Sequence, residues 1–222
     1  MNDVEENCRR VVERIHTAAA RSGRSGEAVR LIAVTKFVSP EKIRRAAALG
    51  ITHIGENRLQ EALTKRDSLR DLDLTWHFIG HLQTNKARKV IENFDWIQSV
   101  DRLDLAEKLD QQAHRRIPVL IEVKLHDEPS KSGMPAGELQ DFLPRVTGLK
   151  NLEVRGFMAV PPYSDIAEES RPYFRRLREL GVLFGLPELS MGMSHDFEIA
   201  IEEGATMVRI GTALFGSRQS TP

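Results

Sequence analysis

Short apolar runs alternate with amphipathic segments along most of the chain. Eight such runs begin at or near residues 31, 52, 76, 95, 118, 153, 188 and 206, and several are rich in β-branched residues. A short apolar run of this kind is typical of a strand that is buried on both faces, as in parallel sheets. The segments between the runs have apolar residues near helical spacing. The pattern therefore predicts eight strands that alternate with helices.

The segments between the runs also carry helix start and stop signals. Ser39 can cap a helix that Pro40 opens and Gly50 closes, since each residue type suits that position. Pro144 lies inside a later segment and is expected to kink or shorten that helix. A further helix before the first strand is predicted by the spacing of Val4, Val11, Val12 and Ile15.

Regular alternation of strands and helices predicts right-handed βαβ units and a parallel sheet with helices outside it. Eight strands fit a single closed (β/α)8 barrel, a TIM barrel, with an extra N-terminal helix. An open doubly wound sheet is the alternative, but "TKFVSPEK" follows the first strand in place of a glycine-rich dinucleotide fingerprint. No linker, low-complexity tract or close repeat divides the sequence, so we expect one domain over residues 1–222.

Composition narrows the class of protein. The 32 basic residues balance the 32 acidic ones, so we expect no nucleic-acid partner. No run approaches the roughly 20 apolar residues of a membrane-spanning helix, and the acidic N-terminus lacks the apolar core of a secretory signal. Cys8 is the only cysteine, which rules out an internal disulfide and suits a reducing compartment. We expect a cytoplasmic protein with no membrane partner.

Lys36 ends the first apolar run, an unusual position for an ammonium group. Burying an unpaired charge costs several kcal/mol, so such a lysine reaches water, pairs with an anion or is deprotonated for chemistry. In a barrel, the carboxyl ends of all strands meet at one rim and build the site. Glu56 and Asn57 end the second run, Arg209 lies in the last, and Ser194 follows the seventh. We expect these groups to converge around Lys36, whereas a lysine that only leans into solvent needs no such neighbours.

The loops after the seventh and eighth runs have the composition of a phosphate site. Their sequences are "MGMS" at 191–194 and "IGTALFG" at 210–216, in the recurrent phosphate position of these barrels. Gly192 and Gly211 allow close approach of the backbone, while Ser194 and Thr212 offer hydroxyl groups. Ordinary turn and capping chemistry is the alternative interpretation of each loop.

Two other motifs resemble functional sites only superficially. His77 and His81 have a metal-like spacing, but the segment is predicted to be a strand followed by a loop, and no acid or cysteine joins them, so we expect no metal site. "EPSKSG" at 128–133 lacks the spacing of a phosphate-binding P-loop and is expected to be a rim loop. The roles of both histidines and of residues 126–134 stay open.

Taken together, the motifs resemble those of the pyridoxal 5′-phosphate homeostasis protein family. In chain order they are "LIAVTK", "GENRLQEALTK", "WHFIGHLQTNKAR", "IEVKLHDEPSKSGM", "RGFMAVPP" and "SMGMSHDFEIAIEEGATMVRIGTALFG". The resemblance implies a barrel like the N-terminal domain of alanine racemase, a fold type III pyridoxal phosphate barrel without the second domain. It also implies that pyridoxal 5′-phosphate is held as an aldimine on Lys36, with further cofactor contacts from Asn57, Ser194, Arg209, Gly211 and Thr212.

The resemblance further implies storage and delivery of the cofactor, and hence vitamin B6 homeostasis, with no catalytic residue. Pyridoxal phosphate-dependent apoenzymes would be the recipients. Which of them receive the cofactor, whether transfer is direct, and whether the protein is a monomer or a weak dimer stay open.

A racemase of low activity is the alternative. Racemisation needs a second acid or base opposite the lysine. In the alanine racemases this group is a tyrosine from an additional domain, which we do not expect here because the chain ends six residues after Gly216. Neither Tyr163 nor Tyr173 is marked as a base, and an arginine at the ring nitrogen would not protonate it. A phosphosugar enzyme on the same barrel is a third possibility, and it would be colourless.

Overall fold

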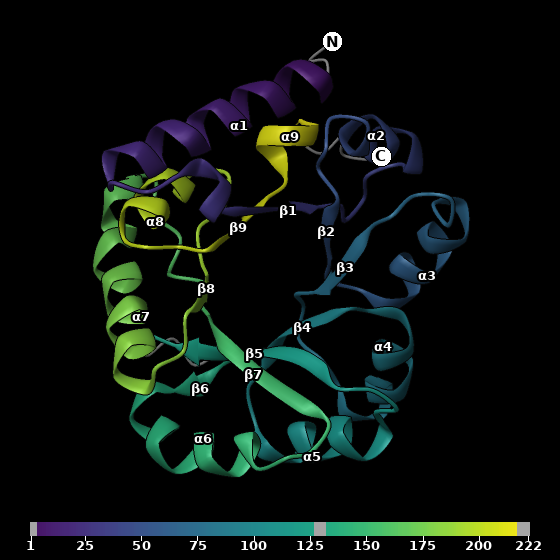
Figure 1. Cartoon of the computed structure of the whole chain (residues 1–222), viewed down its shortest axis with the longest axis vertical. Helices are drawn as coiled ribbons and strands as arrows, with labels where there is room; N and C mark the ends of the chain where they lie inside the picture. Colours follow the sequence, from purple (N-terminus) through teal and green to yellow (C-terminus); the bar gives the residue numbers. More distant parts are fainter. Residues whose placement is uncertain (1–3, 127–131, 217–222) are drawn as a thin grey trace.

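The computed structural model describes residues 4–126 and 132–216 and contains a closed barrel of parallel strands (Figure 1). Within the described chain, eight strands follow one another around the barrel and close through pairings of β1 with β9 and of β4 with β5. They are β1 (Arg30–Val34), β2 (His53–Glu56), β3 (Thr75–Phe78), β4 (Trp96–Val100), β5 (Ile117–Lys124), β7 (Leu152–Met158), β8 (Glu188–Ser190) and β9 (Met207–Ile210). The predicted (β/α)8 barrel is confirmed, and the open sheet is excluded. A short strand that was not predicted, β6 (Met134–Pro135), pairs with the end of β5.

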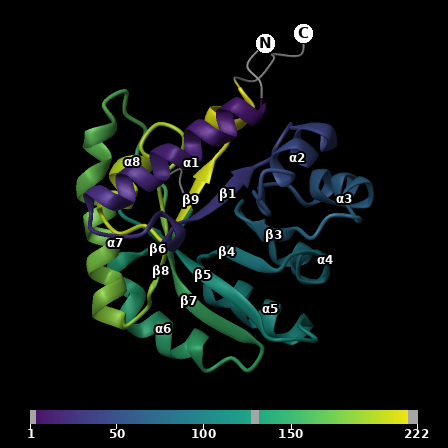
Figure 2. The same cartoon turned by 45° about the horizontal axis from the view of Figure 1, so that its top comes forward.

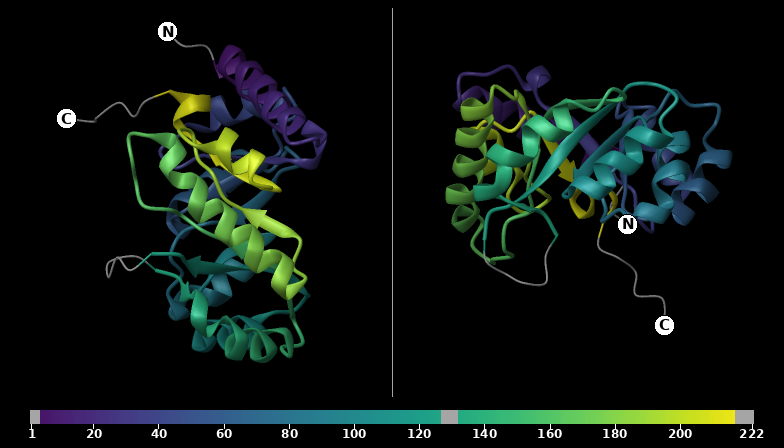
Figure 3. Two further views of the ribbon diagram at one scale, coloured as in Figure 1. Left: turned by 90° about the vertical axis from the view of Figure 1, so that its left-hand side faces the viewer. Right: turned by 90° about the horizontal axis from the view of Figure 1, so that it is seen from below.

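Helices cover the outside of the barrel (Figure 1). The helices of the described residues are α1 (Val4–Arg21), α2 (Pro40–Ala47), α3 (Leu59–Ser68), α4 (Ala87–Asn93), α5 (Leu103–Gln112), α6 (Leu139–Thr147), α7 (Arg171–Phe184), α8 (Phe197–Glu202) and α9 (Thr212–Phe215). Short 3-10 turns occur at η1 (Gly26–Ala28), η2 (Thr84–Lys86), η3 (Ala136–Glu138) and η4 (Ala167–Ser170). Figure 3 shows α7, in light green, along the outside of the barrel. None of the helices in the described ranges has the length and apolar character needed to cross a bilayer.

Several local predictions can be checked in the helices. The Ser39 hydroxyl accepts a hydrogen bond from the Lys42 amide at 3.5 Å, so Ser39 caps α2 as expected. Pro144 lies within α6, which continues past it to Thr147. The extra N-terminal helix is α1, which packs against α8 and α9 (Figure 2). It is held there by a hydrogen bond from Asn7 Nδ2 to the Leu214 carbonyl at 3.1 Å.

Side chains on the strands alternate between two buried layers. Outward-facing residues pack with the helices in one large core, as expected for strands covered on that face. Inside the barrel, a separate small cluster consists of Ile32, Leu120, Met158 and Met207. Because β1 and β9 pair with Ile32 opposite Arg209, both of these side chains belong to the inner layer.

Candidate functional site

The residues predicted to hold a cofactor lie at the carboxyl ends of four neighbouring strands, in the order β2, β1, β9, β8. Lys36 follows β1 and is half-buried, and Asn57 follows β2. Arg209 lies in β9, with Gly211 and Thr212 directly after the strand, and Ser194 is in the loop after β8. The structure therefore brings all six residues to one rim of the barrel.

Arg209 is buried in the barrel beneath this rim, with 4% of its surface exposed. Its Nη1 donates to the Ser190 hydroxyl at 2.7 Å, and its Nη2 donates to the Ala159 carbonyl at 2.8 Å. Burial lowers the pKa of Arg209 to about 10, although the carboxylates of Glu122 and Asp196 oppose this change. The guanidinium is therefore still protonated at neutral pH, and two hydrogen bonds fix its orientation.

The two predicted phosphate loops are joined by hydrogen bonds. The Ser194 hydroxyl accepts from the Gly211 amide and from the Ala213 amide, both at 3.2 Å. Gly192 has a φ of +87°, and an added Cβ would lie 2.5 Å from the Ala200 Cβ, so only glycine fits there. These loops therefore gather a hydroxyl and two backbone amides at one point of the rim.

Asn57 has a buried acceptor that is left unused within the described part of the chain. Its Oδ1 is inaccessible to solvent and makes no hydrogen bond among residues 4–126 and 132–216. The residue also lines a pocket of about 440 Å³ with His81 and Lys86. A buried polar atom normally has a partner, so this oxygen is a candidate for contact with a ligand.

The backbone around Lys36 is held by a group of side chains that we call the Lys65 cluster: Thr35, Glu56, Glu61 and Lys65. Lys65 Nζ donates to Glu56 Oε1 at 2.7 Å, to Glu61 Oε1 at 2.6 Å and to the Thr35 carbonyl at 2.5 Å. Burial raises the pKa of Glu56, outweighing the hydrogen bonds from Lys65 and Thr35. Burial also acts to raise the pKa of Glu61, but hydrogen bonds from Lys65 and the Phe37 amide outweigh it and the pKa is lowered.

Glu56 differs from the expectation that it would converge on the rim with Asn57. Strand residues alternate between faces, and Asn57 and Glu56 are adjacent, so they point to opposite sides. Glu56 faces the helix layer, where it is fully buried and accepts from Thr35 Oγ1 at 2.6 Å. It supports the segment that carries Lys36 from behind.

A chain of polar side chains crosses the barrel interior from Arg209, and we call it the interior chain: Arg209, Ser190, Gln98, His77 and His53. Ser190 Oγ lies 2.7 Å from Gln98 Oε1, and Gln98 Nε2 lies 3.0 Å from His77 Nδ1. His77 Nε2 lies 3.0 Å from His53 Nδ1. His77 is thus a fully buried member of a hydrogen-bonded core.

The other predicted sites have different surroundings. His81 is exposed, with Nδ1 3.6 Å from Asp101 Oδ2. No group of three or more histidine, cysteine, aspartate or glutamate side chains suited to a metal is found in the ranges that the structure covers. Most of the "EPSKSG" motif, residues 128–131, lies outside the described residues.

Several residues of these groups were not singled out in the sequence, among them His53, Lys65, Gln98, Glu122 and Ser190. Glu122 is buried in β5, accepts from Ser132 Oγ at 2.9 Å, and has a pKa that burial raises. Glu122 lies two residues before Lys124, the last residue of β5, so the two charged residues of this apolar run share a strand face, which was the available signal. Gln98 and Ser190 gave no such signal, because the local sequence does not show which strand residues face the barrel interior. Lys65 has the i,i+4 spacing of an ordinary surface pair with Glu61.

Comparison with known proteins agrees with this architecture. The family model "Alanine racemase, N-terminal domain" matches residues 6–219. The alanine racemase of Corynebacterium glutamicum has a TM-score of 0.69 and 19% identity, covering 99% of this chain and 63% of that one. At this identity, the likeness concerns the fold.

More similar proteins share a narrower name. The pyridoxal phosphate homeostasis protein of Aquifex aeolicus is 46% identical over 223 residues, covering 96% of this chain and 98% of its own. That of Escherichia coli K12 is 41% identical over 233 residues, covering 98% of each. The structure of PipY from Synechococcus elongatus with pyridoxal phosphate bound has a TM-score of 0.81 and 43% identity, covering 93% of this chain and all of its own. The chain therefore belongs to the pyridoxal phosphate homeostasis protein family, whose barrel is that of the alanine racemase N-terminal domain.

Proposed function

We propose that this protein binds pyridoxal 5′-phosphate through a covalent bond to Lys36 and serves in the homeostasis of that cofactor. One observation carries the proposal. Lys36, the two hydrogen-bonded loops predicted to bind phosphate, and the buried Arg209 lie next to one another on adjacent strands at one rim of the barrel. The shared name of the relatives, and the pyridoxal phosphate bound to PipY, support the same cofactor.

The residues of the rim fit the parts of the cofactor. The Ser194 hydroxyl accepts hydrogen bonds from the Gly211 and Ala213 amides, which leaves its own proton to donate to a phosphate oxygen. Asn57 Oδ1 offers a buried acceptor that lacks a partner among the described residues. When bound, pyridoxal phosphate supplies an aldehyde carbon, to which a lysine amine can bond with loss of one water molecule. Lys36 would provide that amine.

Arg209 favours a holder over a catalyst. We infer that its guanidinium contacts the pyridine nitrogen, since it is a buried cation that lies inside the barrel beneath the rim. A guanidinium whose pKa is about 10 keeps its own proton at neutral pH. It therefore does not protonate the ring, and the ring is a weaker electron sink than in enzymes that place an acid there.

The tyrosines also fit poorly as a second catalytic base. Tyr163 is 80% exposed, and its hydroxyl donates to Asp165 at 2.9 Å. This hydrogen bond, together with the charge of Asp165, raises the pKa of Tyr163, which disfavours the phenolate. Tyr173 lies in α7, with its ring 6.2 Å from that of His126. We propose that cofactor held here passes to pyridoxal phosphate-dependent apoenzymes instead of turning over a substrate.

The test separates holder from racemase. Purified protein saturated with pyridoxal phosphate is incubated in deuterium oxide with single enantiomers of several amino acids, and loss of the α-proton is followed by NMR. We expect exchange no faster than with the same concentration of free cofactor, whereas an alanine racemase serves as the positive control. Turnover at ordinary enzyme rates would establish the racemase instead. A protein that stays colourless with excess cofactor would point to the phosphosugar class.

A further inference from the structure

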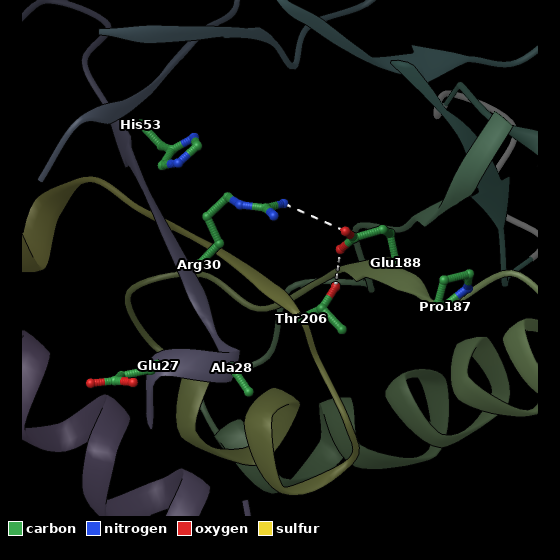
Figure 4. A pocket seen from close by; sticks show the side chains of 7 residues that line it. All are labelled: Glu27, Ala28, Arg30, His53, Pro187, Glu188 and Thr206. Atoms are coloured by element: carbon green, nitrogen blue, oxygen red, sulfur yellow. Dashed lines mark hydrogen bonds and ion pairs between the residues drawn. The ribbon is translucent and has the colours of Figure 1, made fainter. Parts of the chain in front are cut away.

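A second pocket lies at the opposite end of the barrel from Lys36, and we call it the basal pocket. It has a volume of about 380 Å³ and is lined by Arg30, His53, Glu188 and Thr206, among others (Figure 4). Arg30, His53 and Glu188 are the first residues of β1, β2 and β8. Since all these strands are parallel, their amino ends lie away from the rim that carries the proposed cofactor site.

The interior chain reaches this pocket, and its direction of donation follows from Arg209. Arginine only donates, so Ser190 Oγ accepts from it. The Ser190 proton then goes to Gln98 Oε1, which turns the Gln98 amide nitrogen toward His77 Nδ1. Ser190 and Gln98 thus each donate to the next member of the interior chain.

The same logic fixes the two histidines. Burial lowers the pKa of His77 well below its ordinary value, and it also lowers that of His53, so both rings are neutral at pH 7. A neutral His77 that accepts at Nδ1 carries its proton on Nε2, and it donates this proton to His53 Nδ1. A neutral His53 then carries its proton on Nε2. This last donor makes no hydrogen bond to another described residue, and His53 lines the basal pocket.

Arg30 supplies a second donor group in the same pocket. Its Nη1 is buried and makes no hydrogen bond within the described ranges, although Glu188 Oε1 lies 3.7 Å away as an ion pair. The guanidinium lies 5.5 Å from the centre of the Trp96 ring, which holds it in place. Figure 4 shows the Arg30 side chain extending toward Glu188 across the pocket. The Arg30 side chain as a whole is 32% exposed and lines the pocket, so a ligand can reach it from solvent, although Nη1 itself is covered.

Glu188 limits the charge that the pocket can accept. One of its oxygens accepts from the Thr206 hydroxyl at 2.7 Å, which fixes the carboxylate near Arg30. A doubly charged phosphate would be repelled more strongly by this carboxylate than a singly charged group would be. Arginine and the ring N–H of histidine are also suited to the planar oxygens of a carboxylate.

We propose that the basal pocket is a binding site for a small monocarboxylate, which accepts hydrogen bonds from the Arg30 guanidinium and from His53 Nε2. The competing interpretation is a polar plug that only stabilises the amino end of the barrel, the usual role of this end. The proposal does not depend on pyridoxal phosphate binding, because the two sites lie at opposite ends.

Titration of the full-length protein with propionate tests the proposal. Long-range proton–nitrogen NMR of the imidazole rings should first find His53 and His77 as neutral Nε2–H forms. Propionate should then shift the His53 signals saturably, with a dissociation constant on the order of 1 mM, as is reasonable for so small a ligand. Inorganic phosphate at equal ionic strength should bind more weakly. Tighter binding of phosphate, or no saturable shift, would overturn the proposal.

Matched variants localise the site. Arg30→Gln should weaken propionate binding at least tenfold, and Glu188→Gln should strengthen it several-fold because the repelling charge is gone. The gain in Glu188→Gln cannot arise from misfolding. Arg115→Gln is the control, because Arg115 lies two residues before β5 and forms a comparable ion pair with Asp95 at 3.8 Å. An unchanged dissociation constant in Arg30→Gln, or an equal loss in Arg115→Gln, would contradict the assignment.

Discussion

At Phe37, directly after Lys36, the backbone has a φ of +62°. Phe37 is the only non-glycine residue in the described ranges with a positive φ. This left-handed conformation costs about 1–3 kcal/mol and persists where the surroundings impose it. The Lys65 cluster provides such surroundings, because Lys65 binds the Thr35 carbonyl and Glu61 accepts from the Phe37 amide. The position of Lys36 is thus fixed by residues behind it.

Removing Lys65 tests this support. Lys65→Met leaves the fully buried Glu56 carboxylate without its ion-pair partner, and we expect a loss of about 3–5 kcal/mol in the free energy of unfolding. Urea denaturation measures the change. Adding Glu56→Gln to Lys65→Met should recover part of the loss, since the unpaired charge is then gone. Additive losses in the double variant would show that the two side chains do not act as a pair.

At the scale of elements, the interior chain connects β9, β8, β4, β3 and β2 through the middle of the barrel. Gln98 is its central member and is fully buried. Gln98 accepts the proton of the Ser190 hydroxyl, so that the Ser190 oxygen is free to accept from Arg209. Gln98 therefore acts on the proposed cofactor site as a positioning residue.

We therefore expect Gln98→Met to weaken pyridoxal phosphate binding about tenfold, which corresponds to about 1.4 kcal/mol. The NMR signals of His77 should change as well, since its Nδ1 loses a donor. Ser99→Ala is the control, because Ser99 is the buried neighbour of Gln98 on the same strand and donates to the Gly80 carbonyl instead of joining the interior chain. Unaltered cofactor affinity in Gln98→Met would show that the chain does not orient Arg209.

A cluster of arginines around the buried Glu203 fastens α7 to the end of α8. Glu203 accepts from Arg171 at 3.2 Å and from Arg175 at 3.0 Å, and Arg178 lies 3.1 Å away. Burial acts to raise the pKa of Glu203, but these arginines outweigh it, so the pKa is lowered in the folded protein. A carboxylate with a lowered folded pKa stabilises the protein above its unfolded pKa, and that stability is lost as pH falls through the folded value.

Glu203→Gln should therefore be less stable than the native protein at pH 7, with the difference shrinking as pH falls below about 4.3, the ordinary glutamate pKa. Urea unfolding midpoints between pH 3 and pH 7 measure this. Glu168→Gln is the control, since Glu168 also pairs with Arg171 but is 60% exposed. A difference between Glu203→Gln and the native protein that is independent of pH would contradict the cluster's role.

At the scale of the whole molecule, the barrel could be predicted because parallel strands are buried on both faces and appear as apolar runs. Lys36 could be proposed as the cofactor lysine for the same reason, since a lysine at the end of such a run is conspicuous. The resemblance of the motifs supplied the roles of Asn57 and Arg209. The inner layer could not be predicted, because Gln98 and Ser190 become neighbours only when the barrel closes. Neither could the conformation of Phe37, which distant side chains impose.

The N-terminal helix completes the support of the two proposed phosphate loops. Besides the Asn7 contact with α9, Arg14 of α1 pairs with Glu198 of α8 at 2.9 Å. The loops that contain Ser194 and Gly211 lead directly into α8 and α9. The helix outside the barrel repeat therefore anchors the two short helices that follow these loops.

The central claim is that the Lys36 amine forms the bond to the cofactor, and reductive trapping tests it most directly. The native protein is saturated with pyridoxal phosphate, its visible absorbance is recorded, borohydride is added, and the digested protein is mapped by mass spectrometry. We expect a yellow protein that loses its colour on reduction and carries the phosphopyridoxyl group on the peptide containing Lys36. A label on another side chain, or a protein that never becomes coloured, would contradict the account.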